Sequence, residues 1–132
     1  MKKDIKARAD IELLVDEFYK KVQVDPTIGY IFSDIAKVNW QKHLPVMYDF
    51  FENMLFYTGS YNGNPMQLHK HLNRVVPLTP AHFDQWYHLF STTLDEHFSG
   101  PTASLARFRA KSIATVMQIK IREEQMLPGK KE

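Results

Sequence analysis

The chain of 132 residues contains no cysteine. This absence excludes disulfide bonds, zinc sites built on thiolates and catalysis by a thiol. No apolar run approaches the ~20 residues that a membrane-spanning helix needs. Charged residues also interrupt the first ten positions, where a secretion signal would carry its apolar core. We therefore expect a cytoplasmic protein with no membrane segment.

The chain also lacks an excess of charge of either sign. The formal net charge is only +2, and the basic residues are spread along the chain apart from short groups at its two ends. A nucleic-acid-binding surface needs clustered lysine and arginine, so neither DNA nor RNA is an expected partner. No alternation of apolar and polar residues persists long enough to predict a strand. The sequence therefore predicts an all-α protein.

The chain is rich in aromatic and aliphatic side chains. Hydrophobic residues make up 44% of it, with nine Phe, six Tyr and two Trp. At this length the composition supports one domain over residues 1–132, with an ordered core from about residue 5 to residue 125. Large aromatic surfaces suit either such a core or the walls of a pocket for a flat ligand.

Helical periodicity predicts four long helices. They cover about residues 4–23, 37–57, 80–98 and 102–125, with a short turn or helix at 26–33. The inward side of the first helix is expected to contain Ile5, Ile11, Leu14, Val15, Phe18 and Val22. That of the second contains Trp40, Leu44, Met47, Phe50, Phe51, Met54 and Leu55. That of the last contains Leu105, Ala106, Phe108, Ile113, Val116, Met117 and Ile121.

Two prolines have a defined position relative to these helices. Thr79-Pro80 is a start signal, with Thr79 as the N-cap and Pro80 at the first helical position. Pro45 cannot donate a backbone hydrogen bond, so it belongs in the first turns of the second helix or marks a kink there.

A short apolar segment between two predicted helices carries His69 and His71. In a helix, residues two apart point about 200° away from each other, so this pair is disfavoured as a shared metal site. Either histidine alone suits a metal whose other ligands come from elsewhere. Haem meets this condition because the porphyrin supplies four nitrogens and the protein one imidazole. Periodicity does not decide between His69 and His71.

A haem pocket also needs apolar walls and hydrogen-bond donors beside the open coordination position. Suitable donors are Tyr19, His43 and Trp86, although Tyr19 and Trp86 taken singly fit core aromatics with satisfied polar ends better than a binding role. Suitable walls are Phe18, Phe32, Met47, Phe50, Met54, Phe90, Ile113 and Met117. The joint presence of donors, walls and a candidate ligand favours a haem site.

Four segments together resemble the truncated haemoglobins of the third group. They are FYKKV with Tyr19, WQKH with His43, YNGNPMQLH ending at His69, and LTPAHFDQWYHLF with Trp86. The resemblance covers about residues 5–125 and implies a shortened globin, a 2-over-2 helical sandwich around haem b. It selects His69, four residues after the proline of the NGNP turn, as the proximal ligand, with His71 as second choice. It also implies that Tyr19, His43 and Trp86 lie on the distal side.

The resemblance implies a five-coordinate haem iron that binds O2, and also CO and NO. Oxygen transport is one use of such a site. The alternative is a haem enzyme, NO-detoxifying or peroxidase-like, that receives electrons from a reductase. A more remote alternative is a small helical interaction module with structural histidines. We expect a monomer in each case.

Overall fold

The computed structural model describes residues 2–35, 37–59 and 78–125. These ranges contain the helices α1 (Arg8–Val24), α2 (Trp40–Phe56), α4 (Pro80–His97) and α5 (Pro101–Gln125), with a short π-helix, η1 (Ile31–Ile35), before α2. Within them no strand forms, and an isolated bridge joins Lys3 to Phe98. The all-α prediction is thus confirmed. No helix in this part of the chain is long and apolar enough to cross a membrane.

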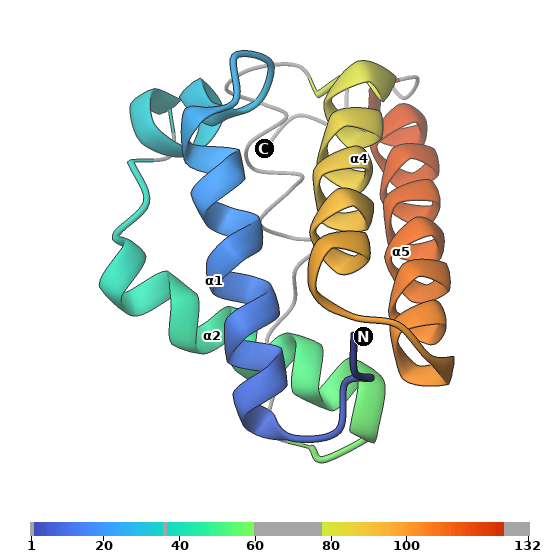
Figure 1. Cartoon of the computed structure of the whole chain (residues 1–132). Helices are drawn as coiled ribbons and strands as arrows, with labels where there is room; N and C mark the ends of the chain where they lie inside the picture. The colour runs from blue at the N-terminus through green and yellow to red at the C-terminus, as the bar shows by residue number, and fades with distance from the viewer. Residues whose placement is uncertain (1, 36, 60–77, 126–132) are drawn as a thin grey trace.

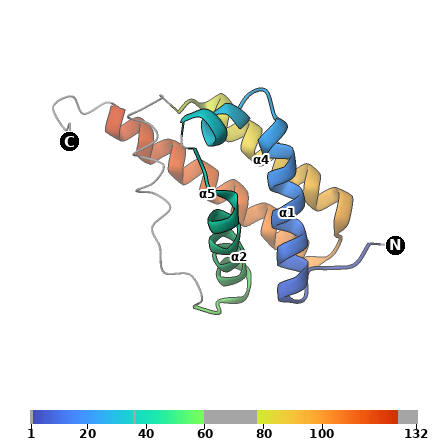
Figure 2. The same ribbon diagram turned by 90° about the vertical axis from the view of Figure 1, so that its left-hand side faces the viewer.

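The helices form two layers. α1 packs against α2 and α4, and α4 packs against α5 (Figure 1). Figure 2 shows α1 and α2 side by side in one layer, running in opposite directions, with α4 and α5 crossing behind them. The second half of α1, with Tyr19, lies against His43 in the first half of α2 and against Trp86 in the first half of α4.

The apolar side of α1 was predicted correctly. All of its expected inward residues are at most 1% exposed. The helix begins at Arg8, however, and not near residue 4. The carboxylate of Asp10 accepts hydrogen bonds from the backbone N–H groups of Lys6 and Ala7, at 2.9 and 3.1 Å. A first-turn carboxylate that binds the preceding N–H groups fixes the helix start at this point.

The inward side of α5 was predicted incorrectly in part. Ala106, Met117 and Ile121 are buried, but Phe108 is 68% exposed and Val116 is 48% exposed. Small residues take their place, because the buried side of the helix also contains Ala103, Ala110 and Ala114. Steps of three and four residues join these positions, as one side of a helix requires.

The first residues of the chain hold the start of α5. The carboxylate of Asp4 accepts hydrogen bonds from the backbone N–H groups of Thr102 and Ala103, at 3.0 and 2.8 Å. Gly100 has a φ of 141°, and a Cβ added there would lie 2.5 Å from Cγ of Asp4. A side chain at position 100 is therefore excluded by both backbone conformation and space.

α2 continues through its proline. The Asn39 side chain caps its start by accepting from Gln41 N at 3.1 Å, and the helix runs past Pro45 to Phe56. Only Phe51 and Leu55 are buried on its apolar side. The other expected residues of that side are half-buried, namely Trp40, Leu44, Met47, Phe50 and Met54. α2 therefore leaves much of its apolar side incompletely covered.

Candidate functional site

The three predicted donors come together from three helices. Tyr19 lies in α1, His43 in the first turns of α2, and Trp86 in α4. The ring centroids of Tyr19 and His43 are 5.5 Å apart with the rings nearly perpendicular. The Tyr19 hydroxyl is also hydrogen-bonded to Trp86. The fold thus gathers side chains that are widely separated in the sequence into one polar group within aromatic surroundings.

Tyr19 stays protonated in this environment. Its side chain is 4% exposed, and burial raises the pKa of its hydroxyl far above the ordinary value, while the hydrogen bond with Trp86 acts in the opposite direction. An indole N–H can only donate, so the tyrosine oxygen is the acceptor in this bond. The hydroxyl proton of Tyr19 is not used by Trp86 and can be donated to a third group.

His43 presents its ring to the same place. The residue is half-buried and its Nε2 atom is buried. Its ring stands nearly perpendicular to Tyr19 and to Trp40, with centroid distances of 5.5 Å in both cases. The continuous helix through Pro45 keeps His43 on the side of α2 that faces α1.

Trp40 belongs to this group and was not among the predicted site residues. Its ring centroid lies 5.3 Å from that of Tyr19, and Phe32 stacks on it at 5.9 Å. The sequence contained a usable signal, because Trp40 precedes His43 by three residues and the two therefore lie on the same side of a helix.

Two of the predicted wall residues support Trp86 from the core. Phe90 stacks on the indole at 5.8 Å, and Phe18 meets it edge-on at 5.6 Å. Phe18 and Phe90 contact each other at 5.3 Å, and both are fully buried. They fix the orientation of the indole, and their contact with a cofactor stays a prediction.

The other predicted wall residues fall into two groups. Phe32, Met47, Phe50 and Met54 are half-buried and pack against the main core. Ile113 and Met117 belong to a second cluster with Ile31, Leu78, Phe83, Ala114 and Ile121. The half-buried apolar side of α2, with polar groups at its start, has the chemistry that the face of a porphyrin requires. The residue types present therefore fit haem.

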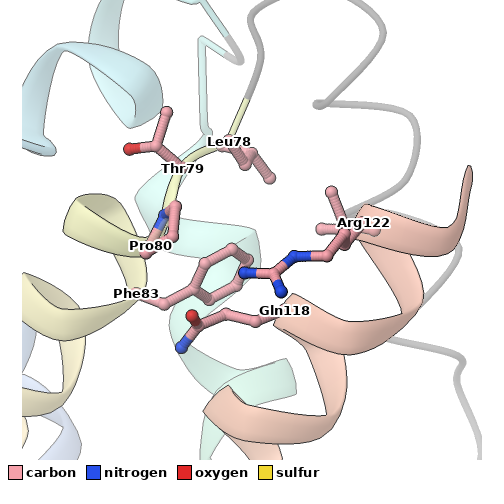
Figure 3. Close-up of a pocket in the computed structure, with 7 residues that line it drawn as sticks. Leu78, Thr79, Pro80, Phe83, Gln118 and Arg122 are labelled. Carbon is pink, nitrogen blue, oxygen red and sulfur yellow. The ribbon is translucent and has the colours of Figure 1, made fainter. Parts of the chain in front are cut away.

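The candidate ligands His69 and His71 lie outside the described residues, so their assignment stays a prediction. A small pocket opens between the start of α4 and the end of α5 (Figure 3). It is lined by Leu78, Thr79, Pro80, Phe83, Gln118, Ile121 and Arg122. None of the predicted site residues is in this lining.

Comparison with known proteins gives three consistent results. The model of the bacterial-like globin family matches residues 3–119. A group 3 truncated hemoglobin of Campylobacter jejuni is 31% identical over 111 residues, which cover 82% of this chain and 85% of that protein. The crystal structure of a group III truncated hemoglobin from Campylobacter jejuni matches with a TM-score of 0.82 at 28% identity, covering 92% of this chain and 95% of that one. Sequence and fold agree over most of the length, and the chain therefore belongs to the bacterial-like globins and, among them, to the group 3 truncated haemoglobins, a family that implies haem as its cofactor.

Proposed function

We propose that this protein binds haem b with His69 as the axial ligand, and that it binds O2 and other diatomic ligands beside Tyr19, His43 and Trp86. The observation that carries the proposal is the group formed by the buried Tyr19 and the half-buried Trp86, with His43 against Tyr19. When bound, haem supplies an iron with one open position for a small ligand. The proposal includes a monomer in the cytoplasm.

The proposed role of His69 rests on the resemblance of the segment YNGNPMQLH. A neutral imidazole binds a metal through one ring nitrogen and donates its other N–H to a neighbouring acceptor, which fixes its orientation. His71 is the second choice for this role.

The distal donors favour a ligand that carries negative charge. A hydrogen bond to a charged group contributes about 1.5–3 kcal/mol, and burial strengthens it. Since each 1.4 kcal/mol corresponds to about a factor of ten in rate, two donors slow ligand release by orders of magnitude. Such retention is unsuited to oxygen delivery. The same observation therefore supports a second function, a haem enzyme that acts on NO, O2 or peroxide with a reductase as electron donor.

Haem titration tests the proposal directly. We expect the purified chain to bind one equivalent of haem, with a Soret band in the ferric, ferrous and CO-bound forms. His69→Ala should abolish this binding, and His71→Ala, the matched control, should retain it. The reverse result would transfer the ligand role to His71. A chain that takes up no haem at all would overturn the proposal and favour the interaction module.

Turnover separates the two uses of the haem. We expect slow O2 release in stopped-flow and rapid NO consumption when NADH and a reductase are present. Fast O2 release without NO consumption would instead support oxygen transport.

A further inference from the structure

α1 and α2 are also joined by polar contacts outside the candidate site. Nη1 of Arg8 contacts the carboxylates of Asp49 and Glu52, at 2.9 and 2.7 Å. Closer to the middle of both helices, the Tyr48 hydroxyl donates a hydrogen bond to the carboxylate of Asp16. α1 and α2 run in opposite directions (Figure 2), and these contacts accordingly pair later residues of α1 with earlier residues of α2.

The next such contact belongs to the candidate site. Asp16 precedes Tyr19 by three residues and Tyr48 follows His43 by five, so both pairs lie within about one and a half turns of each other. The pair of Tyr19 and His43 is therefore the continuation of the same series of contacts.

Pro45 separates His43 from Tyr48 within α2. Proline has no N–H, so the carbonyl of Gln41 lacks the intrahelical bond that residue 45 would normally supply. The first turn of α2, which carries His43, is consequently held less firmly by the helix itself. Its distance from α1 depends on where the helix is fixed just after the proline, which is at Tyr48.

We infer that Tyr48 and Asp16 are positioning residues, which set the distance between Tyr19 and His43 and hence the polarity that a ligand meets at the haem. The inference rests on the proposed function, because it concerns the same site. A hydrogen bond to a carboxylate is stronger than one between neutral groups and suits a fixing role. Partial burial raises the pKa of Tyr48, and the bond to Asp16 raises it further, to about 12, so the phenol remains the donor.

Tyr48→Phe tests the positioning role of the Tyr48 hydroxyl. The substitution removes one oxygen and leaves the ring beneath the Arg8 guanidinium, whose carbon lies 5.6 Å from the ring centroid. Tyr87→Phe is the matched control. Tyr87 is also a half-buried helical tyrosine with a cation over its ring, Lys111 at 4.9 Å. It belongs to α4 and its cation to α5, so the α1–α2 contacts stay intact.

The C–O stretch of the CO complex reports the polarity next to the ligand. We expect Tyr48→Phe to shift or split this band, Asp16→Asn to change it in the same direction by less, and Tyr87→Phe to leave it unchanged. A merely structural role would lower stability without moving the band. An unchanged band in both Tyr48→Phe and Asp16→Asn would overturn the inference.

A second measurement needs no haem. In urea unfolding of the haem-free chain, Tyr48→Phe and His43→Ala should be non-additive, and Tyr87→Phe and His43→Ala should be additive. Additivity in the first pair would contradict the positioning role. If Tyr48→Phe fails to fold, Asp16→Asn takes its place in the cycle. Failure of the original chain to bind haem would refute the proposed function, while the cycle would still decide the coupling.

Discussion

α1 and α2 are helices of equal length, 17 residues each, with comparable apolar sides, yet the protein covers them differently. The side of α1 is fully buried by the rest of the chain, whereas that of α2 is mostly half-buried. Apolar periodicity predicts which side of a helix avoids water, but it does not say whether protein or a ligand covers that side. The difference shows that the protein itself covers the apolar side of α1, whereas α2 keeps apolar surface that, under the proposed function, the haem would cover.

Substitutions in the two helices, Phe18→Ala in α1 and Met47→Ala in α2, test this difference in burial. Phe18→Ala should lower the free energy of unfolding by about 3–5 kcal/mol with or without haem, because it empties a fully buried position. Met47→Ala, on the half-buried side of α2, should cost much less in the haem-free chain and should lower haem retention instead. Urea unfolding with and without haem measures both. Equal losses for the two variants without haem would show that α2 serves the core as α1 does.

The Tyr19 hydroxyl lies where α1 meets the start of α2. Tyr19→Phe removes the buried hydroxyl and should accelerate O2 release about tenfold or more, as expected from loss of a hydrogen bond to a charged ligand. Stopped-flow O2 dissociation measures it. Tyr30→Phe, at an exposed tyrosine, is the control and should leave the rate unchanged. An unaltered rate in Tyr19→Phe would remove Tyr19 from the distal site.

The smallest expected change in stability comes from Asp4, which binds the start of α5 away from α1 and α2. Burial alone would raise the pKa of Asp4, but hydrogen bonds from the backbone N–H groups of Thr102, Ala103 and Ile5 outweigh it and lower the pKa below the ordinary 3.8. The stability that Asp4 contributes is therefore present above pH 3.8 and is lost as the pH falls through the lowered value.

Asp4→Ala should cost about 0.5–2 kcal/mol near pH 7, as for the loss of a helix cap, and less in acid. Urea unfolding at pH 7 and pH 3 measures the difference between the variant and the original chain. Asp84→Ala, at an exposed carboxylate, should have little effect at either pH. A loss for Asp4→Ala that is equal at both pH values would mean that the charge of Asp4 does not stabilise the fold.

Much of the fold could be predicted because helical periodicity is a local signal. The four long helices begin within four residues of their predicted starts and end within one residue of their predicted ends, and Thr79-Pro80 marks the start of α4 as expected. The inner side of α5 was predicted only in part, because alanine is a weak apolar signal, while Phe108 and Val116 are strong ones that face outward. Only the packing of α5 against α4 shows which side is inward.

The site could be predicted by residue type but not by arrangement. Tyr19, His43 and Trp86 were recognisable as donors, since hydroxyl, imidazole and indole groups amid apolar residues are unusual. Their convergence, and the contact of Trp40 with two of them, depend on how α1, α2 and α4 cross. The contacts of Arg8 and of Tyr48 join residues more than 30 positions apart, which no local pattern reveals.

The buried alanines of α5 also affect how closely this helix packs against its neighbours. Side chains between two helices set how closely the helices approach, and a row of buried methyl groups allows α5 to pack closely against its neighbours. A pair packed in this way has little room to slide or separate. α2 differs from this pair, because it contains Pro45 and its apolar side is mostly half-buried.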